Sequence, residues 1–364
     1  MQGVIINVYK RKRYHLFEQH FTDEKKGGGR MIDYVHLTLT IDIHPISFRQ
    51  FMWTKNKTAD GEPYFYHGLR GVHIFYHPCR QRLTIRGKLM MLLRDTQVQN
   101  VDDVYGANTD QFIADINAHL NHLLTHPLLD IRAFEVKRID YCFNVQTPYV
   151  DTYLDLLSTA FEHRANENRV DYTRKNDFYG SVYIKTLSDY EKNERRNYVL
   201  NYYSKLDKLY DQLKKGERVT SRDIDLAMNV LRLEVQCGFQ FLKSLQKEMH
   251  VGNTFGELFS YAVAYRAEKM IYKRVFDSDG TEAFYTYEAA KKLLPAKRKV
   301  ARKTLIVATR HSITDQKYAY ARKQIKAAGI YSHCFIAKGL GIERLDNPLA
   351  LIAAKLEEIG VPLH

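Results

Sequence analysis

The middle of the chain carries the stretch FEVKRIDYCFNVQTPYV, from Phe134 to Val150. Apolar side chains recur at every second position over 139–145, which predicts a strand with one buried face. Thr147 and Pro148 then supply a helix N-cap and a proline in the first helical turn. This stretch therefore predicts a strand that is followed directly by a helix.

The patterns that follow extend this strand and helix into a sheet. Two strand-like runs, a basic helix, a second helical run and a further strand are expected at 178–186, 198–205, 206–214, 224–229 and 231–237. The order β-α-β-β-α-β is typical of a ferredoxin-like or RRM-like antiparallel sheet with helices on one face. We therefore expect an α+β core of this kind whose other sheet face is open.

Composition divides the chain into three segments. Residues 1–30 contain a basic cluster and a Gly-Gly-Gly run, which predicts a flexible extension. We interpret it as an extension from an upstream start, with a mobile DNA-binding arm as the alternative. The α+β core is expected at 31–250, because an alternating strand pattern begins after Met31. Residues 251–364 predict a helical, basic DNA-binding region that begins with the capping box of Thr254 and Glu257.

The charge of the chain favours nucleic acid as the first partner. There are 55 Lys and Arg against 42 Asp and Glu, giving a net charge of +13 and a pI near 9.3. Residues 291–326 carry most of this excess, with twelve Lys and Arg and a single acid. A basic helix face that contacts only solvent is the alternative. The cations expected to face DNA are Lys297, Arg298, Lys299, Arg302, Lys303, Lys317, Arg322, Lys323 and Lys326.

Several other motifs are missing from the sequence. The four cysteines follow no metal-binding spacing, and neither a secretory leader nor an apolar run of about 18 residues occurs. We therefore expect a cytoplasmic protein without a membrane partner. No GxxxxGK[ST] phosphate loop is present either, which agrees with chemistry that conserves the energy of the broken bond in a phosphotyrosine and needs no nucleoside triphosphate.

Three of the predicted strands carry charged or reactive side chains two residues apart, which therefore share one face of each strand. Their opposite faces, apolar on the first and last strands, are expected to pack on the helices. We expect the polar faces to converge on the open side of the sheet. The polar side chains are Arg138 and Asp140, then Asn201, Tyr203 and Lys205, then Arg232, Glu234 and Gln236.

Two carboxylates in this set suit a phosphodiester substrate. Asp140 and Glu234 offer oxygen ligands to a hard cation, Mg²⁺ or Mn²⁺, which would polarise the scissile phosphate. Arg138 and Arg232 could bind phosphate oxygens bidentately. The alternative is a cross-strand ladder of solvated ion pairs, which the same spacing also produces.

A phenol is the expected nucleophile. Tyr203 can attack phosphorus, but a tyrosine with an ordinary pKa near 10 needs a neighbouring cation or base at neutral pH. Lys205 and the metal ion could supply that positive charge. Tyr202 stands beside Tyr203 and is the alternative nucleophile.

At these strands the chain resembles the gene-II-type replication proteins of filamentous phages and related plasmids, the phage/plasmid replication II/X family. The resemblance extends loosely from the Met31-Ile32-Asp33 start to at least residue 260. It implies a nickase that opens one strand at a replication origin, stays joined to the 5′ phosphate and later rejoins the strand. It also implies that the nucleophile is the tyrosine two residues before the lysine, Tyr203 rather than Tyr202. The matching motifs are Arg138-Ile139-Asp140 with Phe143, then Val199-Leu200-Asn201-Tyr202-Tyr203-Ser204-Lys205, Leu231-Arg232-Leu233-Glu234-Val235 and Leu242-Lys243-Ser244.

The motif order is also similar to that of the Rep_trans plasmid initiators, in which an aspartate typically follows the catalytic tyrosine. Ser204 stands at that position here, so no third metal ligand is assigned. The chain lacks the His-hydrophobic-His pair of the HUH nucleases. Its nearest approach, His73 and His77, is interpreted as cross-strand packing.

The resemblance, together with the charge and the polar strand faces, implies a rolling-circle replication initiator in the cytoplasm of a bacterial host. Its expected partners are origin DNA, supercoiled or single-stranded at the nick, and a host helicase and polymerase. Two alternatives stay open: a conjugative relaxase with the same chemistry, and a non-catalytic nucleic-acid-binding regulator built on an RRM-like sheet. The Lys/Arg-Gly-Phe motif usual in RRM domains is missing, which argues against the regulator.

Overall fold

The computed structural model describes residues 32–43, 53–93, 105, 108–124, 129–162, 170–172, 181–186, 197–217, 219–296, 298–303, 305 and 315–361. The predicted extension 1–30 and Lys297 lie outside these residues.

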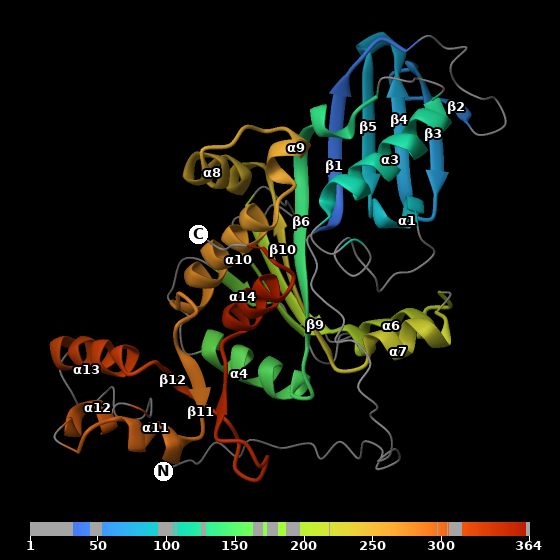
Figure 1. Ribbon diagram of the computed structural model, residues 1–364. Coiled ribbons are helices and arrows are strands. Elements are labelled where there is room, and N and C mark those ends of the chain that lie inside the picture. The colour runs from blue at the N-terminus through green and yellow to red at the C-terminus, as the bar shows by residue number, and fades with distance from the viewer. Residues whose placement is uncertain are drawn as a thin grey trace.

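A single antiparallel sheet of ten described strands runs through the molecule in the order β2-β3-β4-β5-β1-β6-β10-β9-β8-β7 (Figure 1). The long strand β6 lies near its middle and pairs with β1 on one side and β10 on the other. The strands are β1 Ile32–Thr40, β2 Thr54–Lys57, β3 Pro63–Leu69, β4 Val72–His77, β5 Arg82–Gly87, β6 Glu135–Gln146, β7 Val170–Tyr172, β8 Ser181–Thr186, β9 Tyr198–Ser204 and β10 Val230–Cys237.

The first half of the sheet, β1 to β5, is covered on one face by α3, Thr109–Leu124, with the short α1, Met90–Leu93, at its edge. Apolar residues of α3 such as Phe112, Ile116 and Leu120 are buried against this face. The turns η2, Pro78–Arg80, and η3, Ile131–Ala133, connect neighbouring elements.

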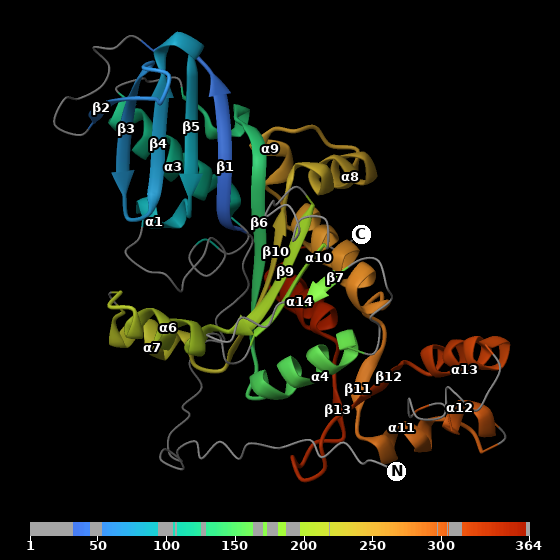
Figure 2. The same ribbon diagram turned by 180° about the vertical axis from the view of Figure 1, so that it is seen from behind.

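The second half of the sheet is covered by helices on the same face. Figure 1 shows the helices in front of the strands, and Figure 2, from behind, shows the strands in front of the helices. The apolar positions expected to pack on helices, including Tyr141, Phe143 and Leu233, are fully buried. The covering helices are α4 Val150–Glu162, α8 Phe239–Met249, α9 Phe255–Leu258, α10 Tyr261–Phe276 and α14 Pro348–Glu358.

Two further helices, α6 (Lys205–Lys214) and α7 (Ser221–Ala227), connect β9 to β10 and extend to the side of the sheet (Figure 2). The C-terminal part adds a small sheet, ordered β12-β11-β13, that the sequence patterns did not predict. Its helices bury a separate cluster that includes Ala290, Ala321 and Ile325. The elements here are β11 Ala283–Tyr285, α11 Tyr287–Leu293, α12 Lys299–Lys303, α13 Asp315–Ala327, β12 Ile330–Phe335 and β13 Arg344–Leu345.

The α+β class is confirmed, but the strand order differs from the ferredoxin-like order that we expected. In that arrangement the first and third strands of the β-α-β-β-α-β unit are neighbours, whereas here β10 lies between β6 and β9. The pairing of β10 with β6 runs unbroken from Val230 opposite Gln146 to Cys237 opposite Ile139. The unbroken ladder along two long buried strands therefore places the last strand, not the third, beside the first.

Within the described residues, no helix combines the length and the hydrophobicity that a bilayer-spanning segment requires.

Candidate functional site

The polar faces of β6, β10 and β9 do meet on the sheet face away from the helices. Arg232 is paired in register with Tyr203, and Gln236 with Asp140. The Tyr203 hydroxyl donates a hydrogen bond to Oε2 of Glu234 at 3.3 Å. Residues that were predicted separately on three strands are thus brought into contact.

A continuous chain of hydrogen bonds links Asp140 to Tyr203. Arg138 donates to both oxygens of Asp140, at 2.7 and 2.5 Å, and its Nη2 also donates to Gln236 at 3.0 Å. Gln236 in turn donates to Oε1 of Glu234 at 2.9 Å. Arg138 and Asp140 therefore form an ion pair within one strand, with Asp140 buried and Arg138 20% exposed, rather than a solvated ladder across strands.

Arg232 is completely buried and lies at the centre of the cluster. Its guanidinium forms an ion pair with Asp33 of β1 and approaches Glu234 at 3.4 Å. It also donates to the sulfur of Cys142 at 3.2 Å and lies 5.9 Å from the centre of the Tyr203 ring. Opposite charges on two sides explain how a guanidinium can be held away from water.

Sequence reasoning missed Asp33 and Lys88. The pairing of β1 with β6 has a register shift between Ile32 and Tyr34, and Asp33 lies at this shift. Lys88, just after β5, contacts the Asp33 carboxylate at 2.9 Å. The one sequence signal for Asp33 was the Met31-Ile32-Asp33 start, which marked where the family resemblance begins rather than a site residue.

The cluster contains three carboxylates in a buried setting. Burial raises the pKa of Asp140 to about 7, although the hydrogen bonds from Arg138 oppose this shift. Burial, and next the charge of Asp33, also raise the pKa of Glu234. A glutamate with a raised pKa beside a phenol can accept its proton.

The two tyrosines of the predicted nucleophile motif lie on opposite faces of β9. Lys205 is the first residue of α6 and is buried, and its charge acts on Glu234. Tyr202 points to the opposite side of β9, where its hydroxyl donates to Oε2 of Glu268 on α10 at 2.9 Å. Because side chains alternate along a strand, Tyr202 does not reach the cluster. The structure therefore removes Tyr202 from the predicted site.

The predicted metal ligands do not form a preformed metal centre. In the part of the chain that the structure describes, no three His, Cys, Asp or Glu side chains are placed to hold one ion. Both oxygens of Asp140 accept hydrogen bonds from Arg138, and those of Glu234 accept from Gln236 and Tyr203. The oxygen donors that Mg²⁺ prefers are present, but arginine and amide groups occupy them.

The sheet face that we expected to be open is buried at the candidate site. Tyr203 is 5% exposed, Glu234 is 4% exposed and Asp140 is 2% exposed. A DNA phosphate can therefore reach the Tyr203 hydroxyl only when this part of the sheet face is uncovered.

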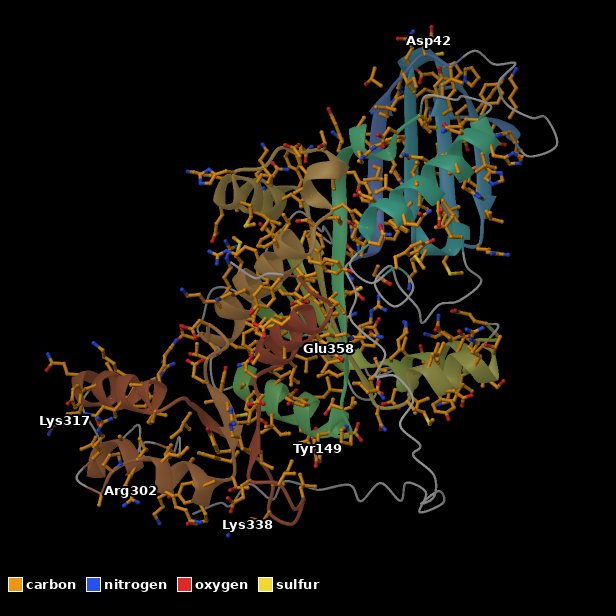
Figure 3. All side chains as sticks on the ribbon, viewed as in Figure 1. Asp42, Tyr149, Arg302, Lys317, Lys338 and Glu358 are labelled. Carbon is orange, nitrogen blue, oxygen red and sulfur yellow. The ribbon has the colours of Figure 1, made fainter. Side chains whose placement is uncertain are left out.

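The predicted DNA-binding cations of the C-terminal part lie elsewhere. Figure 3 places Arg302 on α12 and Lys317 on α13, far from β9 and β10. Arg298 is partly exposed, and Lys317 and Lys323 are exposed. Of Lys299 and Lys303 only the helical backbone in α12 is described.

Three of these cations hold internal contacts. Arg302 donates to the backbone oxygen of Lys291 at 3.1 and 2.9 Å, at the end of α11. Arg322 forms an ion pair with Asp277 at 3.0 Å, and Lys326 forms one with Glu282 at 3.1 Å. The basic surface is therefore smaller than the charge count predicted.

No protein-family model matches the chain, and a search of curated proteins found no match to its sequence.

Proposed function

We propose that this chain is a rolling-circle replication initiator, a DNA nickase that cuts and rejoins one strand through Tyr203. The observation that carries the proposal is the hydrogen bond from the Tyr203 hydroxyl to Glu234, a carboxylate that pairs with the buried Arg232 and feels the charge of the buried Lys205. A phenol beside a carboxylate and buried cations suits nucleophilic attack on a phosphodiester.

The chemical step follows from these contacts. Glu234 takes the Tyr203 proton while the phenolic oxygen attacks phosphorus, forming a phosphotyrosine bond and breaking the bond to the 3′ oxygen, which takes a proton from water. Arg138, which is 20% exposed, is placed to bind a phosphate oxygen, and Lys205 balances the charge of Glu234. The reverse step rejoins the strand, since the phosphotyrosine keeps the energy of the broken bond.

The metal ion, Mg²⁺ or Mn²⁺, remains a prediction, and no step above depends on it. Asp140 and Glu234 would supply its oxygen ligands, with Asp33 as the third carboxylate nearby. Binding an ion there requires Arg138 to release Asp140. Origin DNA, a host helicase and polymerase, and a bacterial cytoplasm belong to the same proposal.

A second candidate is a nucleic-acid-binding regulator without catalytic activity. The observation that favours it is the continuous chain of hydrogen bonds from Asp140 to Tyr203, because a polar core with a purely structural role would contain the same chain. A conjugative relaxase would share the chemistry of the first proposal and differ only in the DNA that it cuts.

The deciding experiment uses the full chain with a supercoiled plasmid that carries the DNA around its gene, with Mg²⁺ or Mn²⁺ and with chelator. We expect open-circular DNA and a covalent protein–DNA adduct on a denaturing gel. Tyr203→Phe should abolish both while still binding DNA. Tyr202→Phe, a change on the helix side of the same strand, is the matched control and should keep nicking. Binding without a nick under every condition would favour the regulator.

A further inference from the structure

The outer face of β3 and β4 carries a row of aromatic side chains that do not belong to the core. Tyr66 lies opposite Phe75 in the strand register, with ring centres 5.3 Å apart, and Tyr64 lies 6.2 Å from Phe75. All three are partly exposed, whereas the alternate residues Ile74 and Tyr76 are buried. We call Tyr64, Tyr66 and Phe75 the aromatic platform.

The two histidines of β4 belong to this platform rather than to a metal site. His73 accepts or donates a hydrogen bond with the Tyr66 hydroxyl at 2.9 Å, and its ring lies 6.0 Å from the Tyr66 ring. His77 stacks on Tyr64 with ring centres 5.3 Å apart. The expected cross-strand packing is what the structure contains.

Cations border the aromatic platform on β5. Arg82 and Arg86 are exposed and lie opposite His77 and His73 in the register. The Arg86 guanidinium lies 5.8 Å from the centre of the Phe75 ring. Its positive charge is therefore close to any ligand that stacks on this ring.

The positive charges of Arg82 and Arg86 on β5, and of Lys137 and Arg138 on β6, act together on His36 of β1. Burial lowers the pKa of His36 to about 4, and the charges of Arg86, Lys137, Arg138 and Arg82 lower it further in that order. His36 accordingly accepts a hydrogen bond from Nε of Arg86 at 3.2 Å. Two acids near this surface are themselves paired with cations: Glu135 with Lys137 at 2.7 Å and Glu62 with Arg80 at 2.7 Å.

Residues paired across the strands connect β4 with the candidate site. The register places His73 opposite Arg86, Arg86 opposite His36, and His36 opposite Arg138. Arg138 contacts Asp140 and Gln236 directly. Four strand spacings separate β4 from β10, about 19 Å, so a short single strand could cover both surfaces.

We propose that the aromatic platform, with Arg82 and Arg86, binds single-stranded DNA and directs it along β5, β1 and β6 toward Tyr203. Exposed aromatic rings stack on bases only where the bases are unpaired, and flanking arginines contact the phosphates. The inference rests on the proposed function for the fate of the strand, but the binding itself does not require Tyr203.

The test measures binding of a fluorescent 20-nucleotide single strand of mixed sequence to the full chain by anisotropy, in chelator so that no nicking occurs. We expect Tyr66→Ala with Phe75→Ala to weaken binding by at least tenfold. Arg82→Gln with Arg86→Gln, at exposed positions that cannot disturb the core, should weaken binding and flatten its salt dependence. Duplex DNA of the same sequence should bind the wild type and both double variants alike.

Phe239→Ala is the matched control, because Phe239 is also an exposed ring with a cation, Lys243, 4.4 Å from its centre. It should leave single-strand binding unchanged. Wild-type affinity in both double variants, or equal loss with Phe239→Ala, would overturn the proposal. The Tyr203→Phe variant distinguishes this proposal from the proposed function. If it binds the single strand normally and still nicks plasmid DNA in Mg²⁺, Tyr203 is not the nucleophile, but the aromatic platform is still supported.

Discussion

At the scale of single residues, Arg232 decides whether the polar cluster can exist. Its guanidinium is fully buried and contacts two carboxylates, Asp33 and Glu234, that come from different strands. A buried charge is tolerated when it is paired, but removing one partner leaves the others without compensation. Arg232 therefore holds the negative charges of this face together.

We predict that Arg232→Met lowers the free energy of unfolding by about 3–5 kcal/mol, because Asp33 and Glu234 lose their shared counter-charge. Arg232→Lys should recover only part of this, since an ammonium cannot bond both carboxylates in a planar fork. Urea unfolding followed by circular dichroism measures the difference. Arg82→Met, at an exposed position, is the control and should change stability by less than about 0.5 kcal/mol. A loss of under 1 kcal/mol in Arg232→Met would contradict the assigned role.

At the scale of elements, one buried contact joins strand β9 to helix α10. The Tyr202 hydroxyl donates to Glu268, and burial raises the pKa of Glu268 from 4.5 to about 8. The folded protein therefore keeps a proton on Glu268 that the unfolded chain releases as the pH rises through this window. Raising the pH from about 4.5 to 8 destabilises the fold by up to about 1.4 kcal/mol per pH unit through this group.

Glu268→Gln should reduce this pH dependence, because a glutamine keeps an oxygen acceptor for Tyr202 and cannot ionise. We expect its stability to exceed that of the wild type above pH 8, with a shallower slope between pH 5 and 8. Urea midpoints across this range measure both. Glu257→Gln, at an exposed helix start, serves as control and should leave the slope unchanged. Equal slopes of unfolding free energy against pH in the wild type and in Glu268→Gln would show that the pKa of Glu268 is not raised by folding.

Element patterns also show what could be predicted from sequence. The alternation of apolar residues along 139–145 and 231–235 correctly assigned the face of β6 and β10 that packs on the helices, since a strand has a strict period of two. It did not predict that the polar face is buried as well. The same period separates Tyr202 from Tyr203. The order of strands was not predictable in this way, because the pairing of β10 with β6 is a long-range contact that leaves no local pattern. Asp33 was missed because it lies at a register irregularity, which breaks the alternation that sequence reading relies on.

At the scale of the whole molecule, the candidate site depends on both halves of the sheet. Asp33 and Lys88 come from the half that carries the aromatic platform, whereas Tyr203 and Glu234 come from the half covered by α10. The β1–β6 ladder joins them. The basic helix α13 lies apart from this face, so the proposed DNA binding involves two separate surfaces, one for a single strand and one rich in lysine (Figures 1 and 3).

This separation predicts that α13 and the aromatic platform bind different forms of DNA. Lys317→Gln with Lys323→Gln removes two exposed charges, so duplex affinity should fall and the slope of log affinity against log salt should decrease by about 0.9 per lost phosphate contact. Single-strand binding should change far less. Arg322→Gln with Lys326→Gln removes the same charge, but these side chains pair with Asp277 and Glu282 and should matter less for DNA. Equal losses in the two double variants would mean that net charge alone attracts DNA. Unchanged duplex binding in both would remove α13 from the proposed DNA-binding surface and leave only the aromatic platform and the sheet face beside it as candidates.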